Sequence, residues 1–348
     1  MRRISRITVA GAATASLALA LSACGSTSTS GSSDSKGDKG LAIAYDVGGK
    51  GDQSFNDAAY AGLEQAQKEF GYETADVEPT EGETDADKEQ RLVSLAKQGY
   101  NPVIGVGYAY AAAVKGAAEK FPKTTFGIVD DATINTKNVA DLVFSEEQAS
   151  YLAGVAAAKS TKSNVVGFVG GVDIPLIHKF QAGFAQGVKD TNPKVKVLSQ
   201  YLTQTAEEGG FSSPDKGKTA AEGQIEKKAD VVYAAAGLSG QGVIEAAAAK
   251  KVWAIGVDSD QYKQAALAKY KDSILTSAMK DVAKAVYNLA KSVEDGKPET
   301  GIVRGDLKTG EVSLSDSNPK FADDAELQEA IKTAKEKIIS GEIKVKSS

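Results

Sequence analysis

The chain has 348 residues, of which 42% are hydrophobic and 25% are charged, and its formal net charge is −5. A chain of this length and apolar content can form two domains with substantial cores. The acidic balance, without a basic stripe, argues against a nucleic-acid-binding protein. A single cysteine leaves no possibility of an internal disulfide, so we expect the fold to be held by its core.

Residues 1–23 have the layout of a secretory signal peptide, in which three arginines precede an apolar stretch of about 15 residues. The stretch is shorter than the roughly 20 residues needed to span a bilayer, which argues against a transmembrane anchor. Leu-Ser-Ala-Cys at residues 21–24 resembles a bacterial lipobox, whose cysteine is acylated. We therefore expect a lipoprotein held at the cell membrane through Cys24. Residues 24–40 would form a flexible tether, because they are rich in Gly and Ser.

Beyond residue 40, short apolar runs alternate with Ala-rich segments of helical spacing. This pattern is typical of parallel sheets covered by helices on both faces. We expect strands at 41–45, 73–78, 102–106, 126–129, 165–169, 196–201, 231–235, 253–257 and 274–277. We expect helices at 56–70, 87–98, 109–120, 146–158 and 241–250.

The elements divide into two α/β lobes, each predicted to be a doubly wound parallel sheet. Lobe 1 is expected to cover residues 41–141 with parts of 258–290, and lobe 2 to cover 142–257 with parts of 290–348. The residues past 257 must supply further strands, so more than one connection between the lobes is expected. Ligands of open parallel sheets bind beyond the carboxyl ends of the strands, so candidate site residues directly follow the apolar runs.

Glycines and acids follow several of the expected strands. The loop of residues 46–57 contains three glycines within four positions, acids that can cap the next helix, and Phe55, whose ring can stack on a planar group. The loop lacks the spacing of a phosphate-binding loop or an EF-hand. Acids at Asp46, Asp130 and Asp258 can accept hydrogen bonds from sugar hydroxyls or ring N–H groups. This chemistry suits a polyol or a nucleoside.

Seven motifs are spread over nearly all of residues 41–305. The most specific are Asp-x-Gly-Gly-x-x-Asp-x-Ser-Phe-Asn at 46–56 and Gly-Val-Asp-Ser-Asp-Gln at 256–261. Together the motifs resemble the basic membrane protein family of ABC-transporter substrate-binding lipoproteins, which includes purine nucleoside receptors. The resemblance implies a periplasmic-binding-protein-like type I fold, with two lobes that are joined by three hinge strands and close on a nucleoside. The other motifs lie at 121–130, 180–187, 211–218, 236–242 and 277–280.

The resemblance also implies roles for individual residues. Phe55 would stack on the purine, and Asp130 would accept hydrogen bonds from its ring nitrogens or amino group. Asp258 would bind the ribose hydroxyls, and Lys280 would donate to the ribose.

Further ligand contacts are implied on both lobes. Asp46 and Asn56 would line the side of the first lobe, and Gly237 would let the backbone come close to the ligand. A second stacking ring is expected at Phe211, within a segment that departs from the family pattern at residues 205–210. Phe180 is the alternative.

The predicted function is an extracytoplasmic substrate-binding lipoprotein that delivers a nucleoside, and more specifically a purine nucleoside, to an ABC permease. The chain itself would be no enzyme, would need no cofactor or metal, and would be a monomer working with separate permease and ATPase subunits. The alternatives are a sugar or autoinducer receptor of the same fold, and a nucleoside hydrolase, whose contiguous acidic signature the sequence lacks. His178, the only histidine, has no visible catalytic partner and is interpreted as a helix residue.

Overall fold

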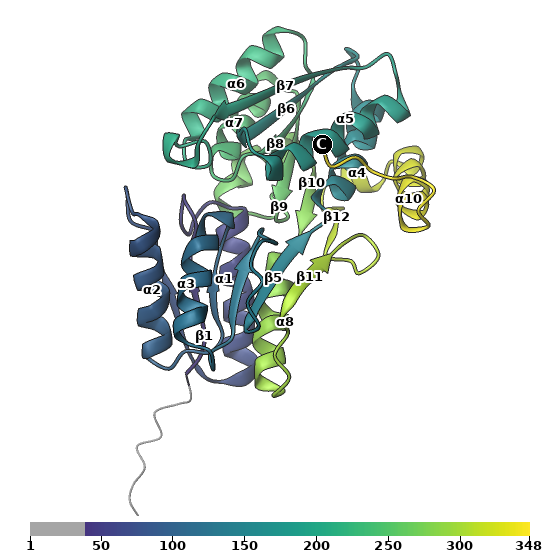
Figure 1. The fold of residues 1–348 in the computed structure, drawn as a ribbon. Helices are drawn as coiled ribbons and strands as arrows, with labels where there is room; N and C mark the ends of the chain where they lie inside the picture. The colour runs from purple at the N-terminus through teal and green to yellow at the C-terminus, as the bar shows by residue number, and fades with distance from the viewer. Residues whose placement is uncertain (1–38) are drawn as a thin grey trace, which may run out of the picture. The chain divides into compact units, whose positions relative to one another are not determined.

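A computed structural model describes residues 39–348 of the chain. The expected signal peptide, the lipidation site Cys24 and most of the expected tether lie outside these residues. The described chain forms two α/β lobes, each with a six-stranded sheet between two layers of helices (Figure 1). The predicted fold class, a two-lobed α/β protein with parallel sheets, is confirmed.

The first sheet has the strand order β11-β5-β4-β3-β1-β2, and all its neighbouring strands are parallel. Helices of the same lobe cover both of its faces. The strands are β1 (Lys39–Ala44), β2 (Glu73–Val77), β3 (Val103–Gly105), β4 (Phe126–Val129), β5 (Val139–Phe144) and β11 (Gly301–Gly305). The helices are α1 (Phe55–Phe70) and α8 (Val282–Glu294) on one face, and α2 (Asp85–Lys97), η1 (Tyr108–Tyr110) and α3 (Ala111–Lys120) on the other.

The sequence of β1 is continuously apolar because both faces of the strand are buried. Leu41 and Ile43 pack in the core shared with α1 and α8, whereas Ala42 and Ala44 pack against α2 and α3. All four side chains are fully buried. A strand covered on both faces has no solvent side, so polar and apolar residues do not alternate along it.

The second sheet has the strand order β12-β10-β9-β8-β6-β7. Strand β12 pairs antiparallel with β10, and the other pairs of this sheet are parallel. The strands are β6 (Val165–Val172), β7 (Lys196–Thr203), β8 (Val231–Ala235), β9 (Trp253–Asp258), β10 (Ile274–Lys280) and β12 (Val312–Leu314). The helices are α4 (Glu146–Ser160), α5 (Pro175–Thr191), η2 (Ala206–Glu208), α6 (Pro214–Glu226), α7 (Ser239–Lys250), η3 (Ala265–Ser273), α9 (Pro319–Ala322) and α10 (Ala325–Ile339).

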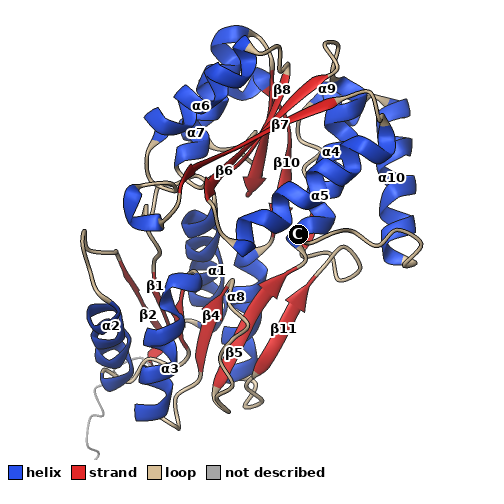
Figure 2. Ribbon diagram, turned by 45° about the horizontal axis from the view of Figure 1, so that its top comes forward, coloured by secondary structure: helices blue, strands red, loops and turns tan. Residues whose placement is uncertain are grey.

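Within residues 39–348 the chain passes between the lobes three times, after β5, after β10 and after β11. Figure 2 shows the two sheets as separate blocks with these passages between them. The passages are hydrogen-bonded to neighbouring segments. The N–H of Ser145 donates to the carbonyl of Gly305 at 2.9 Å, and the N–H of Asp281 donates to that of Glu311 at 2.7 Å. Three adjacent connections form a hinge about which two lobes can rotate.

Several boundaries differ from those expected. The first sheet extends to Phe144, because β5 is a buried strand beside β4 and not part of the connection. Strand β10 belongs to the second sheet and β11 to the first, which the expectation of parts of 258–290 in lobe 1 and parts of 290–348 in lobe 2 did not specify. Lys39 and Gly40, assigned to the tether, open β1, where Lys39 pairs with Glu73. Sheet membership depends on pairing between distant segments, which a local apolar pattern does not report.

Candidate ligand-binding site

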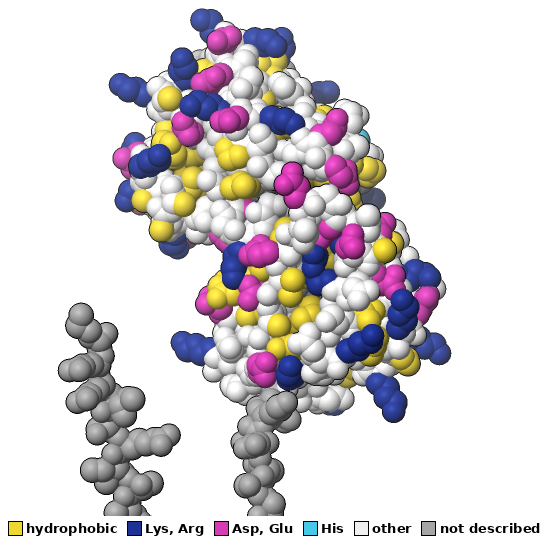
Figure 3. All heavy atoms as spheres, turned by 90° about the vertical axis from the view of Figure 1, so that its left-hand side faces the viewer, with side chains coloured by type: hydrophobic (Ala, Val, Ile, Leu, Met, Phe, Trp, Pro, Cys, Tyr) yellow, Lys and Arg dark blue, Asp and Glu magenta, His cyan; other side chains and the backbone are white. Residues whose placement is uncertain are grey.

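A cavity lies between the lobes, at the carboxyl ends of strands from both sheets. It contains about 540 Å³ of space not filled by protein atoms, a figure that includes the open space at its mouth. Figure 3 shows that the surface narrows where the two lobes meet. The structure brings all eight expected ligand-site residues to this cavity: Asp46, Phe55, Asn56, Asp130, Phe211, Gly237, Asp258 and Lys280.

Asp52 shapes the loop between β1 and α1. Its carboxylate oxygens accept hydrogen bonds from the backbone N–H groups of Ser54 at 2.9 Å, Asn56 at 2.8 Å and Asp57 at 3.2 Å. These are N–H groups that lack carbonyl partners at the beginning of a helix. Burial raises the pKa of Asp52 to about 6, although the three hydrogen bonds oppose the rise. The same turn places Phe55, the first residue of α1, in the cavity wall.

Asn56 lines the cavity, but its side-chain amide also holds the loop together. The Oδ1 atom accepts from the N–H of Asp46 at 3.0 Å, and Nδ2 donates to Asp52 at 3.2 Å. The end of β1 is thereby tied to the first turn of α1. Asn56 is therefore a positioning residue for Asp46, a role that the sequence did not reveal.

The carboxyl group of Asp46 lies at the end of β1 and accepts a hydrogen bond from the N–H of Val47 at 2.8 Å. It packs on Gly107, whose φ of +98° and lack of a side chain leave room for the carboxyl oxygens. Burial raises the pKa of Asp46 to about 7. Near neutral pH this group can therefore act as a hydrogen-bond acceptor or, when protonated, as a donor.

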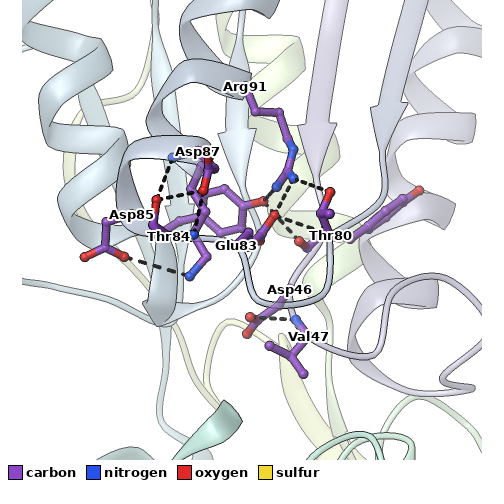
Figure 4. Close-up of polar contacts among 11 residues, drawn as sticks. Asp46, Val47, Thr80, Glu83, Thr84, Asp85, Asp87 and Arg91 are labelled. Atoms are coloured by element: carbon purple, nitrogen blue, oxygen red, sulfur yellow. Dashed lines mark hydrogen bonds and ion pairs between the residues drawn. The ribbon is translucent and has the colours of Figure 1, made fainter.

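A chain of hydrogen bonds supports the strand end that carries Asp46 (Figure 4). The buried Tyr110 hydroxyl donates to the carbonyl of Tyr45 at 3.2 Å. In turn, Nη1 of Arg91 donates to this hydroxyl at 2.6 Å, and Nη2 forms an ion pair with Glu83. The network links α2 and η1 to the last carbonyl before Asp46, so it limits movement of that carboxyl group.

Lys280 is the centre of a buried charge cluster that crosses the cleft. Its Nζ lies 2.6 Å from Oδ2 of Asp130, on the first lobe, and 3.7 Å from Oδ1 of Asp258, on the second. The three side chains are only 4%, 4% and 9% exposed. Burial alone would lower the pKa of Lys280, but the charges of Asp130 and Asp258 outweigh it and raise the pKa above its usual value. Lys280 is therefore a cation at neutral pH.

Both acids of the cluster stand in the left-handed backbone region. Asp130 follows β4 with φ of +69°, and Asp258 ends β9 with φ of +63°. This region is uncommon for residues other than glycine, although Asp tolerates it better than most, and such strain is frequent at functional sites. Among the described residues, Oδ1 of Asp130 is buried without a hydrogen-bond partner. Such an oxygen is costly to leave unpaired, so it is a natural acceptor for a ligand donor.

Three phenylalanine rings contribute to the cavity wall. Nζ of Lys280 lies 4.6 Å from the ring centroid of Phe55 and 5.6 Å from that of Phe180. The third ring, Phe211, packs on Gly171, and its carbonyl lies beside Gly237, which has φ of +53°. A side chain at either glycine would crowd Phe211. Both aromatics considered for the second stacking position thus line the cavity.

Two further residues, one lining the cavity and one close to the charge cluster, were not among the expected site residues. Tyr108 lines the cavity just after β3, where burial first, and then the nearby charges of Asp46 and Glu207, raise the pKa of its hydroxyl to about 12. Glu146 is buried at the start of α4 and accepts from Nζ of Lys179 at 3.2 Å. Burial raises the pKa of Glu146, and Asp130 adds to the rise. The available signals were the Gly-Val-Gly-Tyr strand end and the acid that opens a helix whose later residues are mostly apolar.

Two α/β lobes with largely parallel sheets, three connections, and a cavity between them that is lined by aromatic rings and a few charged side chains define a two-lobed solute-binding protein. The model of the Bmp family, described as PnrA-like ABC transporter substrate-binding proteins, matches residues 40–348. The chain belongs to this family. It is therefore the substrate-binding protein of an ABC transporter, a role of binding and transport and not of catalysis, and it works with permease and ATPase partners.

Relatives and solved structures agree with this assignment. The ABC transporter nucleoside-binding protein BmpA of Lactococcus lactis subsp. cremoris is 37% identical over 329 residues, with 90% of each chain covered. An uncharacterized lipoprotein of Pyrococcus abyssi is 34% identical over 291 residues, covering 79% of this chain and 69% of its own. The crystal structure of an ABC transporter solute-binding protein from Aeropyrum pernix K1 superposes with a TM-score of 0.76 at 28% identity, covering 89% of this chain and 94% of that one.

No helix within residues 39–348 is long and apolar enough to cross a membrane.

His178 lies in α5, as expected for a helix residue, and its Nε2 is 2.6 Å from Oδ1 of Asp173.

Proposed function

We propose that the chain binds a nucleoside, and in particular a purine nucleoside, in the cavity between its lobes and delivers it to the permease. The observation that carries this proposal is the combination of aromatic rings, inward-facing carboxylates and one buried lysine in a single cavity. Aromatic faces stack on planar bases, and carboxylates accept from ring N–H groups and ribose hydroxyls. The nucleoside-binding name of the Lactococcus relative supports the same ligand class.

The proposed contacts are those that the family resemblance implies, and the geometry of the cluster is compatible with them. Phe55 stacks on the base, and the unpaired Oδ1 of Asp130 accepts from a ring N–H or an amino group. Asp258 accepts from the ribose hydroxyls, and Lys280 donates to a ribose oxygen. Because Lys280 is 2.6 Å from Asp130 and 3.7 Å from Asp258, base and ribose contacts meet at this lysine. The ion pairs hold these groups in place before binding, which reduces the entropic cost of ordering them.

The remaining lining residues enclose the ligand from both sides. Phe211 faces the base from the second lobe, with Phe180 as the alternative ring. Asp46 and Asn56 line the side of the first lobe. Gly237 lines the cavity and allows the backbone of the second lobe to approach the ligand. A side chain at Gly237 would also crowd the carbonyl of Phe211.

We further propose that acyl chains on Cys24 hold the protein at the extracytoplasmic face of the cell membrane. The support is the Leu-Ser-Ala-Cys sequence at residues 21–24, together with the lipoprotein name of the Pyrococcus relative. Residues 25–38, rich in Gly and Ser, would act as the tether. This arrangement keeps the receptor close to its permease while the lobes remain free to close.

Calorimetry of residues 25–348, a fragment that retains all of β1, tests the ligand class. We expect guanosine, inosine or adenosine to bind with one site per chain, and Asp258→Asn to weaken that binding. Recovery of intact nucleoside after incubation distinguishes a receptor from a hydrolase. Binding of arabinose or galactose without any nucleoside would identify a sugar receptor instead. Folded protein that gives no heat with any nucleoside would refute the proposal.

A further inference from the structure

The two most specific sequence motifs contain polar residues that the cavity does not use. Ser54 belongs to the motif at 46–56, and Ser259 and Gln261 belong to the motif at 256–261. None of these three residues lines the cavity. Their side chains instead make hydrogen bonds between the lobes.

The carbonyl of Gln53, on the first lobe, receives two donors from the second. Oγ of Ser259 donates to it at 2.8 Å, and Nε2 of Gln261 donates to it at 3.1 Å. Beside them, Ser54 Oγ donates to Oδ2 of Asp258 at 2.5 Å.

A third donor from the second lobe reaches the preceding carbonyls. Nε2 of Gln241, in α7, lies 3.3 Å from the carbonyl oxygens of both Gly51 and Asp52. Three consecutive carbonyl groups of the first lobe, at residues 51–53, therefore face side-chain donors of the second lobe.

The first-lobe loop is held in the shape that presents these carbonyls. Gly51 has φ of +98° and Gln53 has φ of +56°, so the backbone turns sharply at both positions. The carboxylate of Asp57 accepts from the N–H of Gly51 at 2.6 Å and of Gln53 at 3.0 Å. The N–H groups thus point into the loop, and the carbonyls point outward.

The second-lobe donors are also fixed in orientation. Oε1 of Gln261 accepts from the N–H of Val257 at 3.1 Å, which directs Nε2 towards the first lobe. The backbone N–H of Gln261 donates to Oγ of Ser277 at 3.2 Å, and the residue is only 1% exposed. A prearranged donor facing a prearranged acceptor gains more from closure than two mobile groups would.

We propose a latch between the lobes, formed by Gln241, Ser259 and Gln261. These side chains donate hydrogen bonds to the carbonyls of residues 51–53, and the latch sets the balance between open and closed lobes. The latch determines affinity without touching the ligand. If only the closed form retains ligand, the apparent dissociation constant varies inversely with the closed fraction. This inference rests on the lobes closing around a solute, and not on that solute being a nucleoside.

The test compares Gln241→Ala and Ser259→Ala, singly and combined, with Gln181→Ala. Gln181 is a matched control because it lies on α5 and its amide bonds within the second lobe, to Ser199 and Tyr201. Gln241 and Gln181 both lie in helices, where alanine is favourable. Ser259 lies outside the helices, and its replacement also removes the acceptor of Gln264 Nε2. Each lost bond should weaken binding of every ligand by about 2- to 12-fold and raise the dissociation rate, because a hydrogen bond contributes little net free energy.

Distance measurement between the lobes gives a readout that needs no ligand. Labels are attached to residues 25–348 through Glu81→Cys and Glu207→Cys, two exposed positions on opposite lobes. Latch variants should show a larger open population than the Gln181→Ala control, with an unchanged unfolding midpoint. Distributions identical to those of the control would overturn the latch. A shifted distribution with an unchanged dissociation rate would overturn its effect on affinity. If nucleosides fail to bind, the distance measurement still shows whether the latch changes the balance between open and closed lobes.

Discussion

Replacing Lys280 with methionine, which is of similar length but uncharged, is expected to destabilise the protein as well as to abolish ligand binding. The change leaves Asp130 and Asp258 buried without their cation. At 2.6 Å and an effective dielectric of 20, the attraction to Asp130 is roughly 6 kcal/mol, and at 3.7 Å that to Asp258 is roughly 4–5 kcal/mol. Desolvation of the three groups offsets much of this attraction. Removing one partner from a buried ion pair costs about 3–5 kcal/mol, which is the loss of stability that we expect.

Urea unfolding of residues 25–348 without ligand, at pH 7 and pH 5, measures this loss. Acidification should reduce the difference between Lys280→Met and the parent, because burial raises the pKa of Asp258 and its protonation removes a negative charge that has lost its cation. Adding Asp130→Asn to Lys280→Met should restore much of the stability without restoring binding. Lys115→Met is the matched control, since Lys115 and Glu119 form an exposed pair and its loss should change stability little.

Two results would contradict the interpretation that the buried cluster is held together by charge. The interpretation is wrong if the free energy of unfolding of Lys280→Met at pH 7 lies within about 1 kcal/mol of that of the parent, because the loss of an exposed ion pair would cause a change of that size. It is equally wrong if Asp130→Asn destabilises the Lys280→Met protein further, because the aspartate would then contribute by packing and not by charge.

Three further results are expected. Phe55→Ala should weaken nucleoside binding by about 1–3 kcal/mol, the usual effect of losing an aromatic stacking partner, and an unchanged dissociation constant in calorimetry would contradict the stacking role. Burial raises the pKa of Asp46 to about 7, so the folded state holds a proton that the unfolded state releases, and this group alone should lower the free energy of unfolding by about 2 kcal/mol from pH 5 to pH 7. Denaturant titrations at several pH values should show that stability depends less on pH in Asp46→Asn than in the parent. An equal pH dependence in both proteins would count against a raised pKa of Asp46. Cys24→Ala should bind nucleoside normally yet be recovered in the soluble fraction after cell lysis, whereas membrane recovery would exclude anchoring through this cysteine.

Much of the fold could be predicted because its strands are buried on both faces. Strands such as β4 and β8 appear in the sequence as short apolar runs whose bounds the structure reproduces, at 126–129 and 231–235. The strand-end acids of the candidate site could be expected because parallel strands of a sheet bring their carboxyl ends to the same edge. This places Asp46 and Asp130 at the edge of one sheet and Asp258 at the edge of the other, and the resemblance to a two-lobed family implied that the two edges face one cavity. The other expected site residues came from that resemblance.

Only the tertiary structure decided how these residues act on one another. The ion pair between Lys280 and Asp130, the support of Asp46 by Arg91 through Tyr110, and the assignment of β10 and β11 to their sheets join segments far apart in the chain. Local periodicity reports whether a residue is buried, because burial depends on its own element. It does not report which distant side chain lies opposite, because that depends on how the chain passes three times between its lobes.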